Sequence, residues 1–163
     1  MLNVVKLTPP DIVKFRDVVL HSIKESLPPT FSGDGEESES RFYQALLSDL
    51  MQAWIFTDGD VLKCVCVTMI SGDQFSMDKD LLIYGLYGLG DMDQNTVEYG
   101  MDVLGRYAKA LGCQRLSLYT EHDNMISVLT NITGVDPLIT NYVSFDVDEL
   151  TSPKNAVIQE IGA

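Results

Sequence analysis

The sequence predicts an α/β fold of the α+β type, with helices flanking a mixed, mostly antiparallel central sheet. Two observations lead to this prediction. Apolar residues recur at helical spacing in four segments, and short apolar or alternating runs bounded by turn residues lie between them. The chain has 163 residues, 45% hydrophobic and 21% charged, which is enough to bury one core without disulfides. We therefore expect a single domain over residues 1–148 and a tail over residues 149–163.

The first half of the chain predicts a strand, two helices and a hairpin. Thr8 followed by Pro9 and Pro10 is typical of a helix start. Asp58-Gly59 predicts a tight turn, because the favoured hairpin turn needs positive φ at both central residues. The expected elements are a strand at 3–7, a helix from Thr8 to about Glu25, an exposed acidic loop at 30–40, a helix at 41–52, a strand from Trp54 and a central strand at 61–70.

The second half predicts alternating strands and helices. Gly112 and Gly134 each follow an apolar helical stripe, and glycine adopts the left-handed conformation that ends many helices at low cost. Residues 141–147 alternate between polar and apolar, as a half-buried strand does. The expected elements are strands at 81–89, 115–120 and 141–147, a helix at 96–111 and a helix from about Asn124.

Charge and cysteine content limit the functions to consider. Twenty-four acidic residues against 11 basic ones give a formal charge of −13, which disfavours binding to nucleic acids and to anionic membranes. No apolar run reaches the roughly 20 residues that span a bilayer, and no secretory signal is present, so we expect a cytoplasmic protein. Cys64 and Cys66 share one face of a strand and are expected to be reduced core thiols. His21 and His122 lie far from them, so no metal site is expected.

One stretch resembles a known family. KALGCQRLSLYTEHDNMISVLTNITGV, residues 109–135, is similar to the GNAT (Gcn5-related N-acetyltransferase) superfamily, with Gly112, Asn124 and Gly134 at the positions of its helix-end glycine, helix-opening asparagine and helix-closing glycine. The order of elements resembles that family from Asn3 to Val147. A looser resemblance is to acetyltransferase-like proteins of bacteriophage virion gene clusters, which would place the chain in a host cytoplasm or a virion.

The resemblance implies positions for a site. If the protein is active, it implies acetyl-CoA as cofactor and assigns its binding to the residues Leu86, Leu89, Gly90, Asn95, Thr96 and Asn124. Candidate catalytic residues are then Glu121, His122, Tyr119 and Tyr142. The family's tyrosine acid would fall near Thr130 or Asn131, and neither residue can replace it.

The phosphate-binding loop departs from the family pattern. The family has a Gly-rich, often basic loop before a helix N-terminus, where backbone N–H groups hold the pyrophosphate. Here the loop is LGDMDQN, residues 89–95, and it carries Asp91 and Asp93. Two carboxylates facing an anionic cofactor oppose its binding, although as partners of a helix dipole they make ordinary structural sense.

Two functional hypotheses follow. The first is a GNAT-like binding or structural module with no cofactor and no acetyl transfer. Its partner is another protein or a second copy, and residues 149–163 are the candidate binding segment. The second is an active N-acetyltransferase whose acidic surface attracts a cationic amine.

Overall fold

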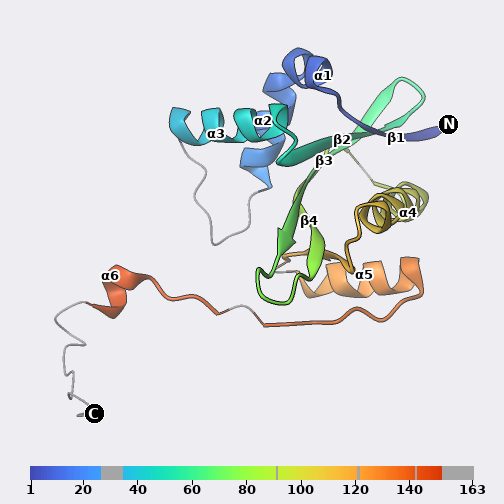
Figure 1. Ribbon diagram of the computed structural model, residues 1–163. Helices are drawn as coiled ribbons and strands as arrows, with labels where there is room; N and C mark the ends of the chain where they lie inside the picture. The colour runs from blue at the N-terminus through green and yellow to red at the C-terminus, as the bar shows by residue number, and fades with distance from the viewer. Residues whose placement is uncertain (27–34, 91, 121, 142, 152–163) are drawn as a thin grey trace, which may run out of the picture.

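The computed structural model describes residues 1–26, 35–90, 92–120, 122–141 and 143–151 (Figure 1). One sheet of five strands lies at its centre, in the order β1-β2-β3-β4-β5. Its strands are β1 (Leu2–Lys6), β2 (Met51–Asp58), β3 (Val61–Gly72), β4 (Lys79–Gly88) and β5 (Arg115–Leu118). The helices are α1 (Pro9–Lys14), α2 (Arg16–Glu25), α3 (Glu36–Leu47), α4 (Gln94–Ala110), α5 (Asp123–Thr133) and α6 (Val147–Leu150).

The sheet is mixed and mostly antiparallel, as predicted. Strands β1 to β4 pair antiparallel in sequence order, and β5 joins β4 in parallel. The central position expected for the Val61 strand is also confirmed, because β3 lies between β2 and β4 and its residues 64–68 are buried. The run is therefore apolar because both faces of β3 are covered.

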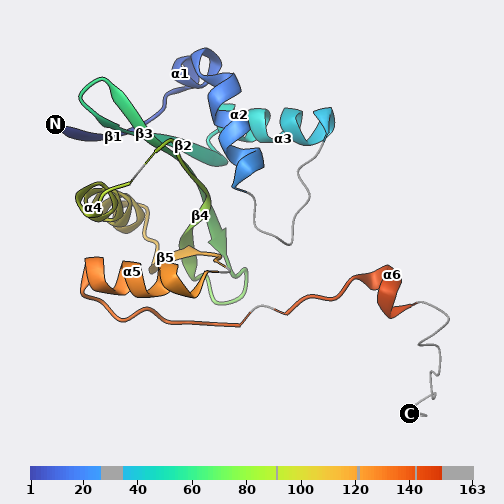
Figure 2. The same cartoon turned by 180° about the vertical axis from the view of Figure 1, so that it is seen from behind.

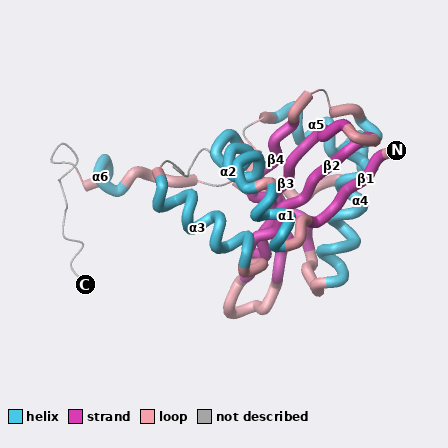
Figure 3. The backbone as a smooth tube through the Cα atoms, turned by 90° about the horizontal axis from the view of Figure 1, so that it is seen from above, coloured by secondary structure: helices cyan, strands magenta, loops and turns pink. Residues whose placement is uncertain are grey.

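Helices cover both faces of the sheet. Figures 1 and 2 show α1, α2 and α3 on one side and α4 and α5 on the other. Successive residues of β3 point to opposite faces, so Val65 and Val67 join one core while Cys64 and Cys66 join the other. Figure 3 shows the same arrangement from above. The first core consists of Leu7, Ile12, Val19, Leu20, Ile23, Leu46, Met51, Ala53, Val65 and Val67. The second consists of Trp54, Phe56, Cys64, Cys66, Ile83 and Leu104.

Burial makes the two strand thiols unreactive. Cys64 and Cys66 are each 0% exposed and form no disulfide. Desolvation raises the pKa of the Cys64 thiol to about 12 and that of Cys66 well above its usual value. Both thiols therefore stay protonated at neutral pH, and they pack as small apolar residues, as the sequence predicted.

Several predicted boundaries were wrong. The first helix is interrupted at Phe15 and forms α1 and α2. Helix α3 begins at Glu36 rather than 41, because three glutamates in its first turn favour the positive end of the helix dipole. Part of the predicted loop at 30–40 is thus helical, and residues 27–34 lie outside the described residues. Asp49 then takes a positive φ of 62°, which ends the helical path and lets β2 begin at Met51 rather than Trp54.

The hairpin turn is shifted by one residue from the prediction. Asp58 pairs with Val61, so the two central residues are Gly59 and Asp60. Gly59 has a φ of 58°, whereas neither aspartate has positive φ. A type II′ turn needs positive φ at its first central residue only, and glycine usually occupies that position.

The strand predicted at 141–147 is wrong. None of the described residues of this segment belongs to the sheet, and Val147 begins the short helix α6. The alternation is present, but among the described residues it has no partner strand, and every described residue from Val135 to Thr151 is exposed. Strand pairing depends on a partner that the local pattern cannot supply.

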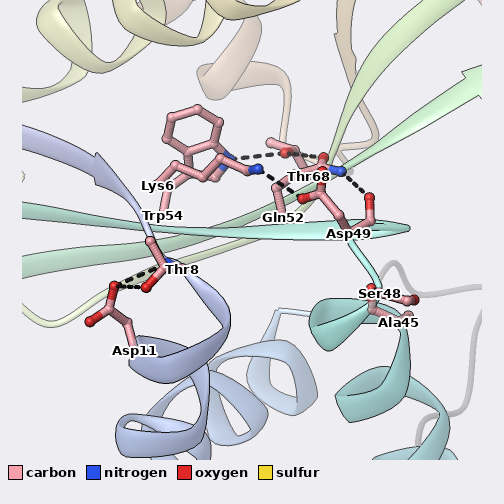
Figure 4. A network of polar contacts seen from close by, with 9 residues as sticks. All are labelled: Lys6, Thr8, Asp11, Ala45, Ser48, Asp49, Gln52, Trp54 and Thr68. Carbon is pink, nitrogen blue, oxygen red and sulfur yellow. Dashed lines mark hydrogen bonds and ion pairs between the residues drawn. The ribbon is translucent and has the colours of Figure 1, made fainter.

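A buried polar chain links β2 to β3 (Figure 4). The indole N–H of Trp54 donates to the Thr68 hydroxyl, which donates to the side-chain carbonyl of Gln52, each at 3.0 Å. The Gln52 amide in turn donates to the carbonyl of Asp49 at 2.8 Å. Gln52 and Thr68 are buried, yet no buried side-chain nitrogen or oxygen among the described residues lacks a partner. These linked hydrogen bonds hold the start of β2 against β3.

Among the residues that the structure describes, no helix is both long and apolar enough to cross a membrane.

Candidate cofactor site at the open edge of β4

The candidate site begins where β4 loses one neighbour. Among the described residues, strand β5 pairs with β4 over Asp80–Ile83 and no further, while β4 continues to Gly88 along β3. Leu89 donates its backbone N–H to the carbonyl of Lys63 on β3 at 2.9 Å. Main-chain groups alternate sides along an antiparallel strand, so Leu86 and Gly88 direct theirs away from β3, towards the open edge. A ligand with amide groups could add to this edge as a further strand would.

A bulge in β4 marks the start of this edge. Val67 pairs with Gly85 and Thr68 with Ile83, so Tyr84 has no opposite residue on β3. A bulge bends its strand and increases the local twist, and this one directly follows Ile83, the last residue of β4 that pairs with β5. Gly85 faces the end of α2, and a Cβ atom at this position would lie 2.6 Å from the hydroxyl of Ser26, the C-cap residue of that helix. A glycine inside a strand pattern is a sequence signal for such a bulge, which the strand predicted at 81–89 did not include.

Helix α4 begins just beyond this edge, and Asp93 caps it. The Asp93 carboxylate accepts the backbone N–H of Thr96 at 2.7 Å and the Thr96 hydroxyl at 2.9 Å. These hydrogen bonds, the backbone one first, lower the pKa of the Asp93 carboxyl, and Lys63 lowers it further. Asp93 is therefore ionised at neutral pH. The position where a helix N-terminus would hold a phosphate already carries a negative charge.

The hollow beside this helix start is small. It has a volume of about 270 Å³ and lies between the first turn of α4 and helix α5. Its lining consists of Met92, Gln94, Val97, Val128, Asn131 and Ile132. No cation is among these lining residues of the described chain, and the volume is below the range of about 300 to 1,000 Å³ typical of sites for drug-sized ligands.

The predicted cofactor residues divide into two groups. Leu86, Leu89, Gly90 and Asn95 are exposed along the open edge and the loop that follows, and Asn124 is exposed in the first turn of α5. Thr96 is only 2% exposed, and its hydroxyl and N–H are both used by Asp93. Thr96 is therefore unavailable to a cofactor in this arrangement.

The predicted catalytic residues are placed in part. Leu118 of β5 pairs in parallel with Ile83, so Tyr119 and His122 follow at the same end of the sheet as the open edge of β4. Both are exposed, and His122 is the N-cap residue of α5, with its backbone N–H bonded to the Thr120 hydroxyl at 3.0 Å. Glu121 and Tyr142 lie outside the described residues.

The position of the family's tyrosine acid is occupied by a different side chain. The Thr130 hydroxyl donates to the carbonyl of Ile126, one turn earlier in α5, at 2.8 Å. Asn131 lines the small hollow beside α4. Neither side chain is an acid of suitable pKa for a departing thiolate.

An acidic hollow at the far end of β4 is separate from this site. It has a volume of about 280 Å³ and is lined by Ser71, Gly72, Asp73, Ser76, Asp78, Asp80 and Arg115. It lies at the start of β4, whereas the open edge lies at its end, and ten strand residues span about 30 Å. An amine bound there would not reach a cofactor at the open edge. Among the described residues, no group of His, Cys, Asp or Glu side chains gathers as a metal site would require.

Comparison with known proteins reveals the fold. No family model matches the chain, and no curated protein sequence matches it. A solved structure of a probable acetyltransferase superposes with a TM-score of 0.64 at 14% identity, covering 90% of this chain and 99% of its own. A predicted acetyltransferase from Clostridium acetobutylicum with acetyl-CoA gives a TM-score of 0.63 at 17% identity, covering 91% of this chain and 98% of its own.

A further similar structure holds a cofactor-like ligand. AAC(6')-Iy in complex with the bisubstrate analogue CoA-S-monomethyl-acetylneamine gives a TM-score of 0.62 at 14% identity, with 90% of this chain and 99% of that one covered. At such low identity these similarities establish the fold alone. None of these three structures is described as a bacteriophage protein, so the looser resemblance stays a prediction. The chain has the GNAT acetyltransferase fold, as the resemblance in residues 109–135 indicated.

Proposed function

We propose that this chain is a GNAT-fold protein that does not bind acetyl-CoA and acts as a binding or structural module. The observation that carries the proposal is Asp93, which occupies the N-terminus of α4 with an ionised carboxylate. A virion-associated role, as suggested by the looser resemblance to phage proteins, is one setting for such a module.

Charge explains why the site disfavours a pyrophosphate. Each pair of like unit charges about 4 Å apart costs about 1 kcal/mol in water and about 4 kcal/mol near a protein surface. The loop at residues 89–95 contains two aspartates and no Lys or Arg. Lys63 on β3 is close enough to affect Asp93, but its single charge is shared with that carboxylate. The attraction of the helix dipole for a phosphate is equivalent to about half a charge, so the repulsion from the two aspartates is larger.

Removing the charge while keeping the helix cap tests this explanation. Asparagine caps helices as well as aspartate, so Asp91→Asn combined with Asp93→Asn retains the fold of α4. We expect millimolar acetyl-CoA to raise the melting temperature of this double variant but not of the wild type. Ligand at 100 times its dissociation constant adds about 2.7 kcal/mol to the free energy of unfolding.

The matched control is Asp102→Asn, which removes a charge from the exposed middle of the same helix. This position is nine residues after Asp93, about 13 Å along the axis, so it should leave acetyl-CoA binding unchanged. Thermal stabilisation of the wild type by acetyl-CoA would overturn the proposed function. Stabilisation of neither protein would show that charge is not what closes the site.

An active N-acetyltransferase is the second candidate, and the open edge of β4 favours it. Leu86 and Gly88 present main-chain groups there, and Tyr119 and His122 follow β5 at the same end of the sheet. This function predicts release of CoA thiol from acetyl-CoA in the presence of a cationic amine, with the rate reduced in Tyr119→Phe or His122→Ala. Equal thiol release in the presence and absence of the protein would exclude it.

A further inference from the structure

The last residues of β4 present main-chain groups to which no described strand is paired. Leu86 and Gly88 direct their N–H and C=O groups away from β3, and they lie beyond Ile83, where the described pairing with β5 ends. Among the described residues, the main chain of neither forms a hydrogen bond outside the sheet. An unpaired strand edge is a template for another extended chain.

The side chains beside this edge suit an apolar residue of such a chain. Leu86 is 38% exposed and Leu89 is 45% exposed. The hollow between α4 and α5 adjoins the edge, because Met92 lines it and a Cβ atom at Gly88 would lie 3.6 Å from Met92 Cγ. Its volume of about 270 Å³ suits one side chain better than a drug-sized ligand. Three of its other lining residues are also apolar: Val97, Val128 and Ile132.

The charge around the edge favours a cationic ligand. Residues 84–98 include the end of β4 and the start of α4, and residues 116–134 include helix α5. These two segments contain five acidic residues and no Lys or Arg: Asp91, Asp93, Glu98, Glu121 and Asp123. Lys63 on β3 lowers the pKa of the Asp93 carboxyl, and its single charge does not balance the five.

We propose that the open edge of β4 binds a basic, extended peptide segment of a partner protein as an added strand. The peptide pairs with Leu86 and Gly88, places an apolar side chain in the hollow between α4 and α5, and sets a Lys or Arg beside Asp93. This inference rests on the proposed function, because the peptide takes the place that acetyl-CoA would occupy. Main-chain hydrogen bonds supply affinity in such pairing, while side-chain contacts supply specificity. The Asp93 carboxylate that repels a pyrophosphate attracts a cation.

Amide hydrogen exchange of the full chain, followed by NMR, tests the proposal. The probe is a short capped peptide in which valine and threonine alternate and a lysine stands at each end, so that a lysine reaches the start of α4 in either direction of pairing. We expect saturating peptide to slow exchange at Leu86 and Gly88 by at least about tenfold. The N–H of Tyr87 faces β3, so its exchange should not change.

Matched peptides separate strand pairing from charge. One peptide is N-methylated on its valines and another on its threonines, and only one of these two sets of amides faces β4 in an added strand. We therefore expect one of the two to lose binding and the other to retain it. A peptide with glutamates in place of the lysines should bind more weakly, and added salt should weaken the lysine peptide.

Two variants of α4 test the role of Asp93. Asp93→Asn keeps the helix cap and removes the charge, so it should weaken the lysine peptide about fivefold. Asp102→Asn removes a charge from the exposed middle of the same helix and should leave the affinity unchanged.

Three outcomes would overturn the peptide site. The first is unchanged exchange at Leu86 and Gly88 with the peptide in excess. The second is equal binding of the lysine and glutamate peptides or of both N-methylated peptides. The third is slow exchange at Leu86 and Gly88 that depends on protein concentration without peptide, which would mean that a second copy covers the edge. A wild type that fails to bind both the peptide and acetyl-CoA would refute this inference and leave the proposed absence of cofactor binding in place. A wild type that binds acetyl-CoA would refute the proposed function, whatever the peptide does.

Discussion

Gly100→Ala should destabilise the protein by about 2 kcal/mol, although alanine is the better helix former. A Cβ atom at Gly100 would lie 2.2 Å from Cε2 and 2.8 Å from Cζ of Phe56. The ring cannot move aside easily, because Phe56 is 4% exposed and packs in the core with Trp54 and Leu104. Overpacking costs up to about 3 kcal/mol, which exceeds the gain of about 1 kcal/mol in helix propensity. Urea unfolding would measure the difference.

Gly105→Ala is the control for this substitution. Gly105 lies in the same helix, and a Cβ atom there would have nothing within 4 Å. Only the helix propensity changes, so we expect stabilisation of up to about 1 kcal/mol. Equal effects at Gly100 and Gly105 would contradict the close packing of α4 on β2, and with it the placement of the helix whose start forms the candidate site.

Thr68→Val should destabilise the protein by about 3 kcal/mol, although valine has nearly the same shape. Thr68 is 0% exposed and bonds both the Trp54 indole and the Gln52 side chain. Valine would leave a buried donor and a buried acceptor without partners, each at a cost of about 1 to 3 kcal/mol. Denaturant unfolding monitored by the fluorescence of Trp54, the chain's single tryptophan, reports on both stability and the bond itself.

Thr68→Ser separates hydrogen bonding from packing. Serine keeps the hydroxyl and loses one methyl group, which costs about 1 kcal/mol. We therefore expect Thr68→Ser to be the milder change even though it leaves more empty space. If valine were tolerated better than serine, the polar chain between β2 and β3 would have no role in stability.

Local sequence patterns predicted most of the helices and strands. The strand prediction at 141–147 was wrong, because strand formation there depends on pairing with a distant segment. The central position of β3 followed from its continuous apolar run, and the ends of α4 and α5 from Gly112 and Gly134, which have φ of 75° and 65°. The strand expected at 141–147 had the right alternation, yet alternation does not reveal whether a partner strand is available. The first helix is split at Phe15, whose φ of −103° and ψ of 18° depart from the helical values, and the apolar stripe gave no signal for this break.

The candidate site was predictable in composition but not in geometry. The sequence placed Asp93 in the loop before a helix expected from Thr96, as a partner of the helix dipole, whereas in the structure Asp93 is the N-cap of α4, which begins at Gln94. The sequence does not show that Thr96 is buried with its N–H and its hydroxyl both bonded to Asp93. It also does not show that β4 continues beyond Ile83, its last residue paired with β5. Both depend on how three separate segments meet. Residue types thus predicted a weakened phosphate site, while the bulge at Tyr84 and the open edge beyond it needed the structure.

Isothermal titration of the wild-type protein with acetyl-CoA tests the central claim most directly. The claim is that a GNAT fold is present while the capped start of α4 and the acidic loop exclude the cofactor. We predict no heat of binding up to millimolar acetyl-CoA. Saturable binding with a dissociation constant in the micromolar range, equivalent to about −8 kcal/mol, would contradict the account.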